Sequence, residues 1–407
     1  MKVLIPFAYY YPEQCAGIYI VHDLMDRLAA EGHEVLLVCP SPTRNVDKSV
    51  RAPHSEVHSE GRIRIIRFPM YGEGKNPVMR AIRYCLCEVV YLWYMLTKRY
   101  DVAFIDSTPP IQGLKLPIVR FFRRKPIVYN AQDLFPDTLS GTGLAKQGGL
   151  AWKIGTWVSK VTFNNSDRII AISNDIAKNI IAKGVSENKV SVIYNWSDTG
   201  TIIPIDRNEN PLYNELGISK DKFTVVYAGN LGNAQNINII MEAATKLVHD
   251  NDIRFLIFGC GGMEEDIKEY KKRYNLTNLN IFPLQPPSKV AMVYGLGDLC
   301  VVSCKPGLGK AAMPSKTWSI MSSGSAVLAS FDEGELKDII TKNRCGIFTP
   351  AGDAEAFTEA ILQAKLGGEC NKMGQRGRKF VEDNLTKEQG TLQYKKILEN
   401  TVYSNKQ

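Results

Sequence analysis

The sequence predicts an α/β protein built from two doubly wound parallel sheets in tandem. A chain of 407 residues is longer than one hydrophobic core usually supports, so two domains of about 200 residues each are expected. Short β-branched runs alternate with amphipathic helical stretches on both sides of a polar segment at residues 198–221. This alternation is typical of parallel strands joined by crossover helices.

Each half of the chain supplies its own series of apolar strands. The first half contains KVLIPFAYY, EVLLVCP, IRIIRF, DVAFIDS, PIVYNAQ, RIIAIS and VSVIYN. The second half contains FTVVYAGN, RFLIFGC, NLNIFPL, DLCVVSC, SAVLAS and CGIFTP. Ligands of such sheets bind at the carboxyl ends of the strands, so we expect the two sets of ends to face each other across a cleft.

Positive charge is concentrated in the first half. Residues 1–200 hold 25 lysines and arginines against 18 acidic residues, and the remainder hold 25 against 24. The apolar segment at residues 77–98 and the segment PIVRFFRRK at residues 117–125 mix basic with aromatic residues. Such mixing suits an anionic membrane surface, although a buried helix explains the first segment equally well. No nucleic-acid-reading motif is present, and we expect no nucleic acid partner.

The cysteines and the amino terminus indicate the compartment. Nine cysteines occur without a Cys-x-x-Cys pair or a zinc-ligand spacing, which favours reduced cytosolic thiols. The amino terminus leads directly into a strand without a leader pattern. No uncharged stretch reaches the roughly 18 residues that span a bilayer. We therefore expect a cytoplasmic protein that associates peripherally with the inner face of the cell membrane.

The segment AAMPSKTWSIMSSGSAVLAS, residues 311–330, is the most informative for function. It predicts a short helix between a Pro-Ser start and a glycine, followed by a small apolar strand. Ser315 is placed to cap the helix, and Lys316 lies in its first turn. A lysine there is unfavourable beside the positive end of the helix dipole unless an anion compensates. The segment therefore predicts a diphosphate site, with a simple capped helix as the alternative.

Glycine-containing strand-to-helix turns occur in both halves. Gly17 precedes an amphipathic helix after the first strand, and Gly229, Asn230 and Gly232 repeat this arrangement in the second half. A tight turn needs glycine with or without a ligand, so each turn alone is ambiguous. A third turn, FGCGGMEEDIKEY at residues 258–270, lacks the G-x-G-x-x-G spacing of a dinucleotide site.

Taken in order, these segments resemble the retaining, nucleotide-sugar-dependent glycosyltransferases of family 4. That family has the GT-B fold, in which two Rossmann-like domains face across a cleft. The resemblance spans nearly the whole chain and is specifically to bacterial surface-polysaccharide and lipid-linked-glycan members of the fucosamine or colanic-acid type. It rests on YYYPEQCAG, LMDRLAAEGHEVLLVCPSP, YNAQDLFPDTLSGTG, DRIIAIS, VIYNWSD, YAGNLGNAQNI, MEAATKL, FGCGG, NLNIFPLQPPSKVAMVYGLGDLCVVS and MPSK.

The resemblance implies an acceptor-binding domain at residues 1–200 and a donor-binding domain at 201–384, with a helix at about 385–403 returning to the first. It implies transfer of a hexosyl or N-acetylhexosaminyl group, without metal or cofactor, to a lipid-linked or glycan acceptor of capsule or exopolysaccharide synthesis. The donor would be a nucleotide sugar, commonly UDP-linked. Its expected contacts are Gly17, Gly229, Asn230, Gly232, Gly259, Gly261, Leu284, Ser315, Lys316 and Ser319.

The chain departs from the family pattern at the donor site. Many relatives carry two glutamates eight positions apart, where this chain has Ala311 and Ser319. We therefore expect Lys316 to be the main cation on the diphosphate. Glu333, in the loop FDEGEL, could replace a lost contact to a ribose or sugar hydroxyl.

On the acceptor side, the family's frequent histidine is Gln132 in this chain, so that group cannot act as a base. Asp133 and Asp137 follow it, and we expect them to orient an acceptor hydroxyl, with a turn-capping role for Asp133 as the alternative. Lys316 and Asp133 are thus the predicted catalytic residues. The Asp-x-Asp at residues 250–252 is interpreted as a solvated turn, so no metal site is predicted.

Two other functions remain open on the sequence. A nucleotide-sugar epimerase could have the same fold, although it needs carboxylates and a histidine around the sugar, and histidines are sparse. A non-catalytic partner subunit that binds a nucleotide or a lipid is consistent with the missing glutamate pair.

Overall fold

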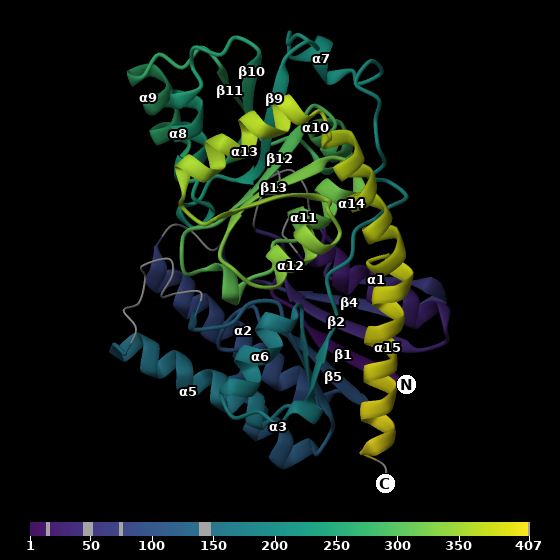
Figure 1. Ribbon diagram of the computed structural model, residues 1–407. Coiled ribbons are helices and arrows are strands. Elements are labelled where there is room, and N and C mark those ends of the chain that lie inside the picture. The colour runs from purple at the N-terminus through teal and green to yellow at the C-terminus, as the bar shows by residue number, and fades with distance from the viewer. Residues whose placement is uncertain (14–16, 44–51, 73–75, 138–147, 406–407) are drawn as a thin grey trace. The chain divides into compact units, whose positions relative to one another are not determined.

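The structure is a computed structural model that describes residues 1–13, 17–43, 52–72, 76–137 and 148–405. Parts of two quoted segments, residues 14–16 and 138–143, lie outside the described residues. The chain forms two compact units, of which the second is Asn195–Lys387 and the first holds the described residues before and after it. Each unit is an α/β layer structure around one largely parallel sheet, which confirms the predicted fold class (Figure 1).

The first unit has an eight-stranded sheet of order β3-β4-β2-β1-β5-β6-β7-β8. Its strands are β1 Lys2–Pro6, β2 Glu34–Pro40, β3 Ser55–His58, β4 Ile63–Phe68, β5 Val102–Asp106, β6 Ile127–Ala131, β7 Arg168–Ala171 and β8 Val190–Val192. The seven predicted strands are confirmed. The sequence did not predict β3, a short polar edge strand that pairs antiparallel with β4, because its residues show no apolar alternation.

Six α-helices of the described residues belong wholly or largely to the first unit. They are α1 Ile18–Ala30, α2 Pro77–Thr97, α3 Leu116–Arg123, α5 Leu150–Asn164, α6 Asn174–Ala182 and α15 Lys387–Ser404. The predicted helix at 77–98 is confirmed as α2, which starts with proline at its first position and with the Asn76 side chain accepting from the Val78 amide at 2.9 Å.

The carboxyl-terminal helix α15 packs on the first unit. The Tyr394 hydroxyl donates to Asn130 Oδ1 of β6 at 2.9 Å, and the Tyr394 ring lies edge-on to Phe104 of β5. His33 and Glu399 pair at 3.2 Å near the opposite end of the helix. Tyr394 and Leu398 are fully buried, so α15 completes the core of this unit.

The second unit has a six-stranded, wholly parallel sheet of order β11-β10-β9-β12-β13-β14. Its strands, all of them predicted, are β9 Phe223–Asn230, β10 Ile253–Cys260, β11 Leu279–Phe282, β12 Leu299–Ser303, β13 Ala326–Phe331 and β14 Gly346–Pro350. Its helices are α7 Leu212–Glu215, α8 Asn238–Lys246, α9 Glu264–Arg273, α10 Val290–Tyr294, α11 Lys316–Ser322, α12 Glu335–Lys342, α13 Ala354–Gly367 and α14 Cys370–Asn384.

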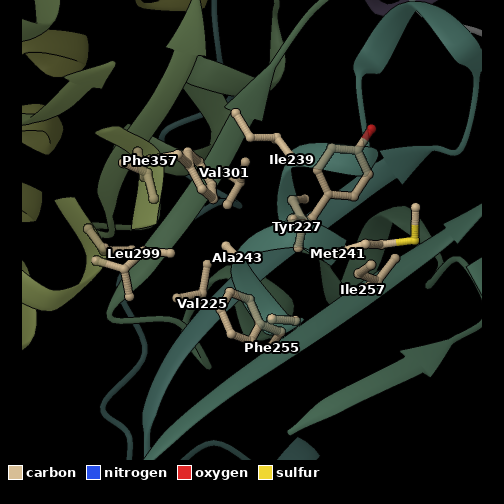
Figure 2. Close-up of a cluster of buried hydrophobic side chains, with 14 of the residues drawn as sticks. Val225, Tyr227, Ile239, Met241, Ala243, Phe255, Ile257, Leu299, Val301 and Phe357 are labelled. Atoms are coloured by element: carbon tan, nitrogen blue, oxygen red, sulfur yellow. The ribbon is translucent and has the colours of Figure 1, made fainter. Parts of the chain in front are cut away.

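One face of this sheet carries the hydrophobic core of the second unit. Alternate residues of β9, β10 and β12 point into it, as the period of a strand requires, and α8 and α13 cover them (Figure 2). The cluster includes Val225, Phe255, Leu299, Ile239 and Phe357. All five side chains are buried, so the central strands are held in fixed positions beneath the loops that follow them.

Helix α14 fixes the position of α11, the helix that carries Lys316. Arg378 Nη1 donates to the Ser322 carbonyl at the end of α11 at 2.6 Å. Gly374 of α14 lies so close to the turn after α11 that an added Cβ would be 1.8 Å from the Gly324 carbonyl oxygen. Only a residue without a side chain permits this approach of two backbones.

We expect Gly374→Ala to destabilise the protein by about 1–3 kcal/mol, because the methyl group would force α14 away from α11. Gly367→Ala is the matched control, since a Cβ at Gly367 meets nothing within 4 Å. The control should be close to neutral or slightly stabilising. Urea denaturation of the two variants would measure the difference, and equal midpoints would contradict the predicted role of Gly374.

Candidate functional site

The second unit contains a cavity of about 260 Å³ at the carboxyl ends of β9 and β10. This is the sheet edge at which doubly wound sheets bind ligands. Its walls come from the ends of the two strands, the segment after β11, and helices α10 and α11. The lining residues are Ala228, Gly229, Phe258, Leu284, Gln285, Val290, Val293, Tyr294, Ser315, Lys316 and Ser319.

The Lys316 ammonium group dominates the electrostatics of this cavity. Its Nζ atom is buried, has no hydrogen-bond partner within the described residues, and lies 4.0 Å from the centre of the Tyr227 ring. Burial lowers the pKa of Lys316 to about 7, because desolvation disfavours the charged form of the amine. An anion entering the cavity would favour the charged form, so the site is suited to a negatively charged ligand.

Gly229 makes room for this lysine. Its φ of 143° lies in a region that residues with a side chain rarely adopt, and an added Cβ would be 3.0 Å from Lys316 Nζ. The Tyr227 hydroxyl donates to the Asn230 carbonyl at 2.7 Å. The turn after β9 is therefore held by Tyr227, whose ring faces the lysine.

The predicted cap of α11 is wrong. The Ser315 side chain makes no capping hydrogen bond, because its backbone (φ −59°, ψ −25°) is already helical, whereas a capping serine needs an extended backbone. The amides of Thr317 and Trp318 donate to the Pro314 and Ser315 carbonyls, so these two N–H groups are not available to an anion. The charge of the site comes from Lys316.

Five of the predicted donor residues are brought together by the structure. These are Gly229, Leu284, Ser315, Lys316 and Ser319. The hydroxyls of Ser315 and Ser319 come from one face of α11, four residues apart. Together they give the cavity one cation and two hydroxyl groups.

The other predicted glycines pack two turns against each other. A Cβ at Gly259 would be 2.4 Å from the Gly229 carbonyl oxygen, and a Cβ at Gly261 would be 2.6 Å from the Leu231 carbonyl oxygen. A Cβ at Gly232 would be 2.7 Å from Asn230 Nδ2. These positions and Asn230 do not line the cavity. Close backbone approach accounts for Gly259 and Gly261, and the Asn230 and Gln235 side chains crowd Gly232.

Gly17 and Glu333 are not among the residues that line this cavity. Gly17 belongs to the first unit, where it precedes α1 with φ 87°. Glu333 is exposed and forms an ion pair with Lys337 at 2.6 Å. The structure therefore does not bring Glu333 to the cavity lining, and the expected replacement contact has no support from the geometry.

Aromatic and aliphatic side chains form the rest of the lining. Phe258 stacks on Phe282 with centroids 5.0 Å apart, and Leu284 is half exposed at the cavity. Val290, Val293 and Tyr294 of α10 complete this apolar part. Sequence reasoning did not identify α10 or Tyr227 as parts of the site. Tyr227 is an aromatic residue only two positions before Gly229, and this position was the signal that could have indicated it.

In the first unit, polar residues gather at the carboxyl ends of β5 and β6. Asn130 Nδ2 donates to Asp106 Oδ1 at 2.9 Å, and Asn130 Oδ1 accepts from Tyr394 and from Gln132 Nε2. Burial raises the pKa of Asp106 to about 7. Sequence reasoning missed Asp106, although the run DVAFIDS places it at a strand end.

The two predicted acceptor-side aspartates differ in their surroundings. The Asp133 amide donates to Ser107 Oγ at 3.3 Å, and the residue is exposed at the surface. Asp137 forms an ion pair with Lys183. The structure thus places Asp137 in a structural contact, while the Asp133 carboxylate remains accessible.

Neither a metal cluster nor a membrane-spanning helix is found within the described residues. No group of three or more His, Cys, Asp or Glu side chains there could hold a metal ion. No helix in the described part of the chain is long and apolar enough to cross a bilayer. Asp250 of the Asp-x-Asp segment pairs with Lys365 at 2.9 Å.

Two family models match successive parts of the chain. Glycosyltransferase Family 4 matches residues 19–201, and Glycosyl transferases group 1 matches residues 209–380. WcaI of Escherichia coli strain K12, described as a glycosyl transferase of colanic acid biosynthesis, is 26% identical over 402 residues, which cover 95% of this chain and 97% of WcaI.

Solved structures of low sequence identity share the fold over the whole length. Sucrose-phosphate synthase from Thermosynechococcus elongatus has a TM-score of 0.80 at 18% identity, covering 99% of both chains. Anabaena HepE in complex with UDP and glucose has a TM-score of 0.73 at 13% identity, covering 98% of this chain and all of HepE. The two parallel sheets, the two family matches and these whole-length structural similarities agree with one another. The chain belongs to glycosyltransferase family 4 and has the GT-B fold.

Proposed function

We propose that this glycosyltransferase moves a hexosyl or N-acetylhexosaminyl group, with retention of configuration, from a UDP-linked donor to a lipid-linked or glycan acceptor of bacterial surface polysaccharide. The Lys316 amine carries the proposal: it is buried in the cavity of the second unit and has no hydrogen-bond partner among the residues that the structure describes. The role of WcaI in colanic acid biosynthesis and the UDP bound to HepE support the choice of pathway and nucleotide.

The cavity supplies what a nucleoside diphosphate needs. Leu284, which is 48% exposed and lies in the cavity lining next to the fully buried Phe258, offers apolar surface to a planar base, and Lys316 offers positive charge to the diphosphate. When the bond between the sugar and the diphosphate breaks, negative charge grows on the leaving oxygen, and a fixed cation stabilises that charge in a site shielded from water. Lys316 thereby fills the role of a metal ion, so we propose a reaction that needs neither metal nor cofactor.

The acceptor hydroxyl forms the new bond to the anomeric carbon on the face that the diphosphate leaves. Its proton passes to an oxygen of the departing diphosphate, so charge and atoms balance without a protein base. We propose that the Asp133 carboxylate, whose residue is exposed, orients that hydroxyl and so lowers the entropic part of the barrier. Gln132 occupies the neighbouring position and contributes an amide rather than a base.

UDP binding should take up a proton above neutral pH. The pKa of Lys316 is about 7 in the free protein, and a bound diphosphate raises it because it favours the ammonium form. The dissociation constant of UDP should therefore rise towards tenfold per pH unit between about pH 7 and 8.5, with uptake of roughly one proton at about pH 8. Calorimetry in two buffers of different ionisation enthalpy measures this uptake.

Lys316→Arg is the matched control for this experiment. Arginine keeps its charge throughout this pH range, so any binding to the variant should show a flat pH profile and no proton uptake. Lys316→Met should weaken UDP binding and also remove the pH dependence. A steep pH profile that persists in both variants would show that another group takes up the proton.

We further propose that the first unit docks on an anionic membrane through a lipid-facing surface formed by α2, α3 and α5. Helix α3 contacts both α2 and α5. Each helix exposes large apolar side chains, including Val89 and Trp93 at 65% and 55%, Phe121 and Phe122 at 76% and 68%, and Leu150 and Trp157 at 76% and 57%. Apolar exposure on this scale marks an interaction surface.

The charges around these helices favour anionic lipid as the occupant. Arg80, Arg99, Arg124, Lys153 and Lys160 are exposed on or beside them. The acidic residue that the three helices contain is Glu88, and it is paired with the buried Lys115 at 2.7 Å. Basic residues next to aromatic ones suit the headgroup layer of an anionic bilayer. An acceptor with a lipid carrier would meet the enzyme there, on the cytoplasmic face.

Replacing both phenylalanines, Phe121→Ser with Phe122→Ser, should reduce binding to phosphatidylglycerol vesicles by about tenfold or more, because each ring contributes roughly 1–3 kcal/mol on leaving water. Vesicle flotation measures the bound fraction. Leu366→Ser is the control, since Leu366 is 85% exposed on α13 of the second unit and should leave binding unchanged.

Two results would contradict the docking surface. Equal binding of the double variant and the control would exclude α3 from the interface. A concentration-dependent dimer in light scattering, abolished by the double variant, would show that a second copy of the chain covers these helices instead of lipid. Binding that disappears with neutral phosphatidylcholine vesicles would support the assigned role of the basic residues.

A further inference from the structure

A second and larger cavity lies in the first unit, in a groove between α1 and the β3–β4 pair. Its volume is about 670 Å³, within the range of small-molecule sites, roughly 300–1,000 Å³. The tyrosines that follow β1 close one end of the groove. None of the site residues predicted from the sequence lines it, and the mechanism above does not use it.

The floor of the groove is apolar and rigid. Ile63 and Ile65 come from one face of β4, and Met25 comes from α1. All three side chains are only 1–2% exposed, so core packing holds them in place and each presents a small apolar area to the groove. A ligand can pack on this floor without reorganising the protein.

A buried arginine holds the rim of the groove in place. Arg67 is only 3% exposed, and its guanidinium donates to Glu56 Oε1 at 2.6 Å, to the Pro53 carbonyl at 3.2 Å and to the Tyr11 carbonyl at 2.8 Å. Its Nε atom is buried without a hydrogen-bond partner in the described part of the chain. Arg67 thus connects three segments of the rim and retains one unused donor.

Two imidazole–carboxylate pairs line the groove. On α1, His22 lies 3.6 Å from Asp26 and 2.8 Å from the Tyr10 hydroxyl. On β3, His58 lies 3.0 Å from Glu56. Each pair can both donate and accept hydrogen bonds. Among the described residues these side chains do not form a metal-binding group.

Tyr11 provides an exposed aromatic ring at the end of the groove. Its ring is 42% exposed and lies edge-on to His22, with centroids 5.2 Å apart. An anionic ligand is disfavoured here, because Asp26 and Glu56 face the groove and Glu56 already neutralises Arg67. A cation has no third carboxylate to hold it. The ligand that fits is neutral, with hydroxyl groups around an apolar face.

A sugar ring has this chemistry: its C–H groups form apolar faces, and its hydroxyls point outward. We infer that the groove between α1 and β3–β4 binds a neutral sugar residue of the acceptor glycan. The assignment to an acceptor rests on the proposed function, whereas the binding of a sugar rests on the groove alone. The apolar floor and Tyr11 take the ring faces, and the two imidazole–carboxylate pairs take the hydroxyls.

Saturation-transfer NMR with methyl glycosides of glucose, galactose and N-acetylglucosamine tests the groove on the full chain. At least one glycoside should give a signal with the wild type, and Tyr11→Ala and Asp26→Asn should each reduce it several-fold. Tyr403→Ala is the matched control, because Tyr403 is 66% exposed on α15 of the same unit, and it should leave the signal unchanged.

Absence of a signal from all three glycosides, or equal signals from Tyr11→Ala and Tyr403→Ala, would overturn the inference. Thermal stabilisation by UDP, measured on the same variants, separates this result from the donor site, because Tyr11 and Lys316 belong to different units. Sugar binding without stabilisation by UDP would support the sugar site in the groove and contradict the proposed UDP-linked donor. Stabilisation by UDP without sugar binding would support the proposed donor and contradict the sugar site.

Discussion

The contact of the buried Lys316 amine with the Tyr227 ring is the interaction on which the proposed donor site depends. A buried amine without a hydrogen-bond partner is unfavourable, so the surrounding structure must hold it there. Gly229 leaves the space, and a side chain at that position would meet Lys316 Nζ. Arg378 and Gly374 of α14 hold α11 against the sheet from the other side. The stability of the second unit thus maintains an amine that is poised for an anion.

Tyr227 connects this site to the hydrophobic core. Its ring belongs to the cluster formed by β9, β10, β12 and α8, and its hydroxyl points away from the aliphatic side chains (Figure 2). That hydroxyl donates to the Asn230 carbonyl, which fixes the turn after β9. One side chain therefore contributes to packing, to the shape of the turn and to the surface beneath the lysine. Preorganisation of this kind reduces the rearrangement needed when charge develops.

The sequence was sufficient for the fold and only partly for the site. Buried parallel strands are continuous apolar runs that can be recognised one at a time, whereas β3 is polar and exists through its pairing with β4. Lys316 was found because a lysine in a first helical turn is unusual. Its contact with Tyr227 joins distant parts of the chain. The predicted role of Gly259 and Gly261 in donor binding stays a prediction, because close backbone packing requires glycine at both positions whether or not a ligand binds. The groove between α1 and β3–β4 depends on β3, so no local pattern could indicate it.

Burial shifts the pKa values of Lys316, at the start of α11, and Asp106, at the end of β5, in opposite directions, and both pKa values lie near 7. It lowers the pKa of Lys316 to about 7 in the second unit and raises that of Asp106 to about 7 in the first. In each case the neutral form is favoured because the protein withholds water from the charge. Within the described part of the chain the Lys316 amine has no hydrogen-bond partner, whereas Asp106 is connected through Asn130 to Tyr394 of α15. Loss of hydration thus has two different consequences. The Lys316 amine can still interact with a charged ligand, whereas Asp106 takes part in the hydrogen-bonded contact that joins α15 to the sheet of the first unit.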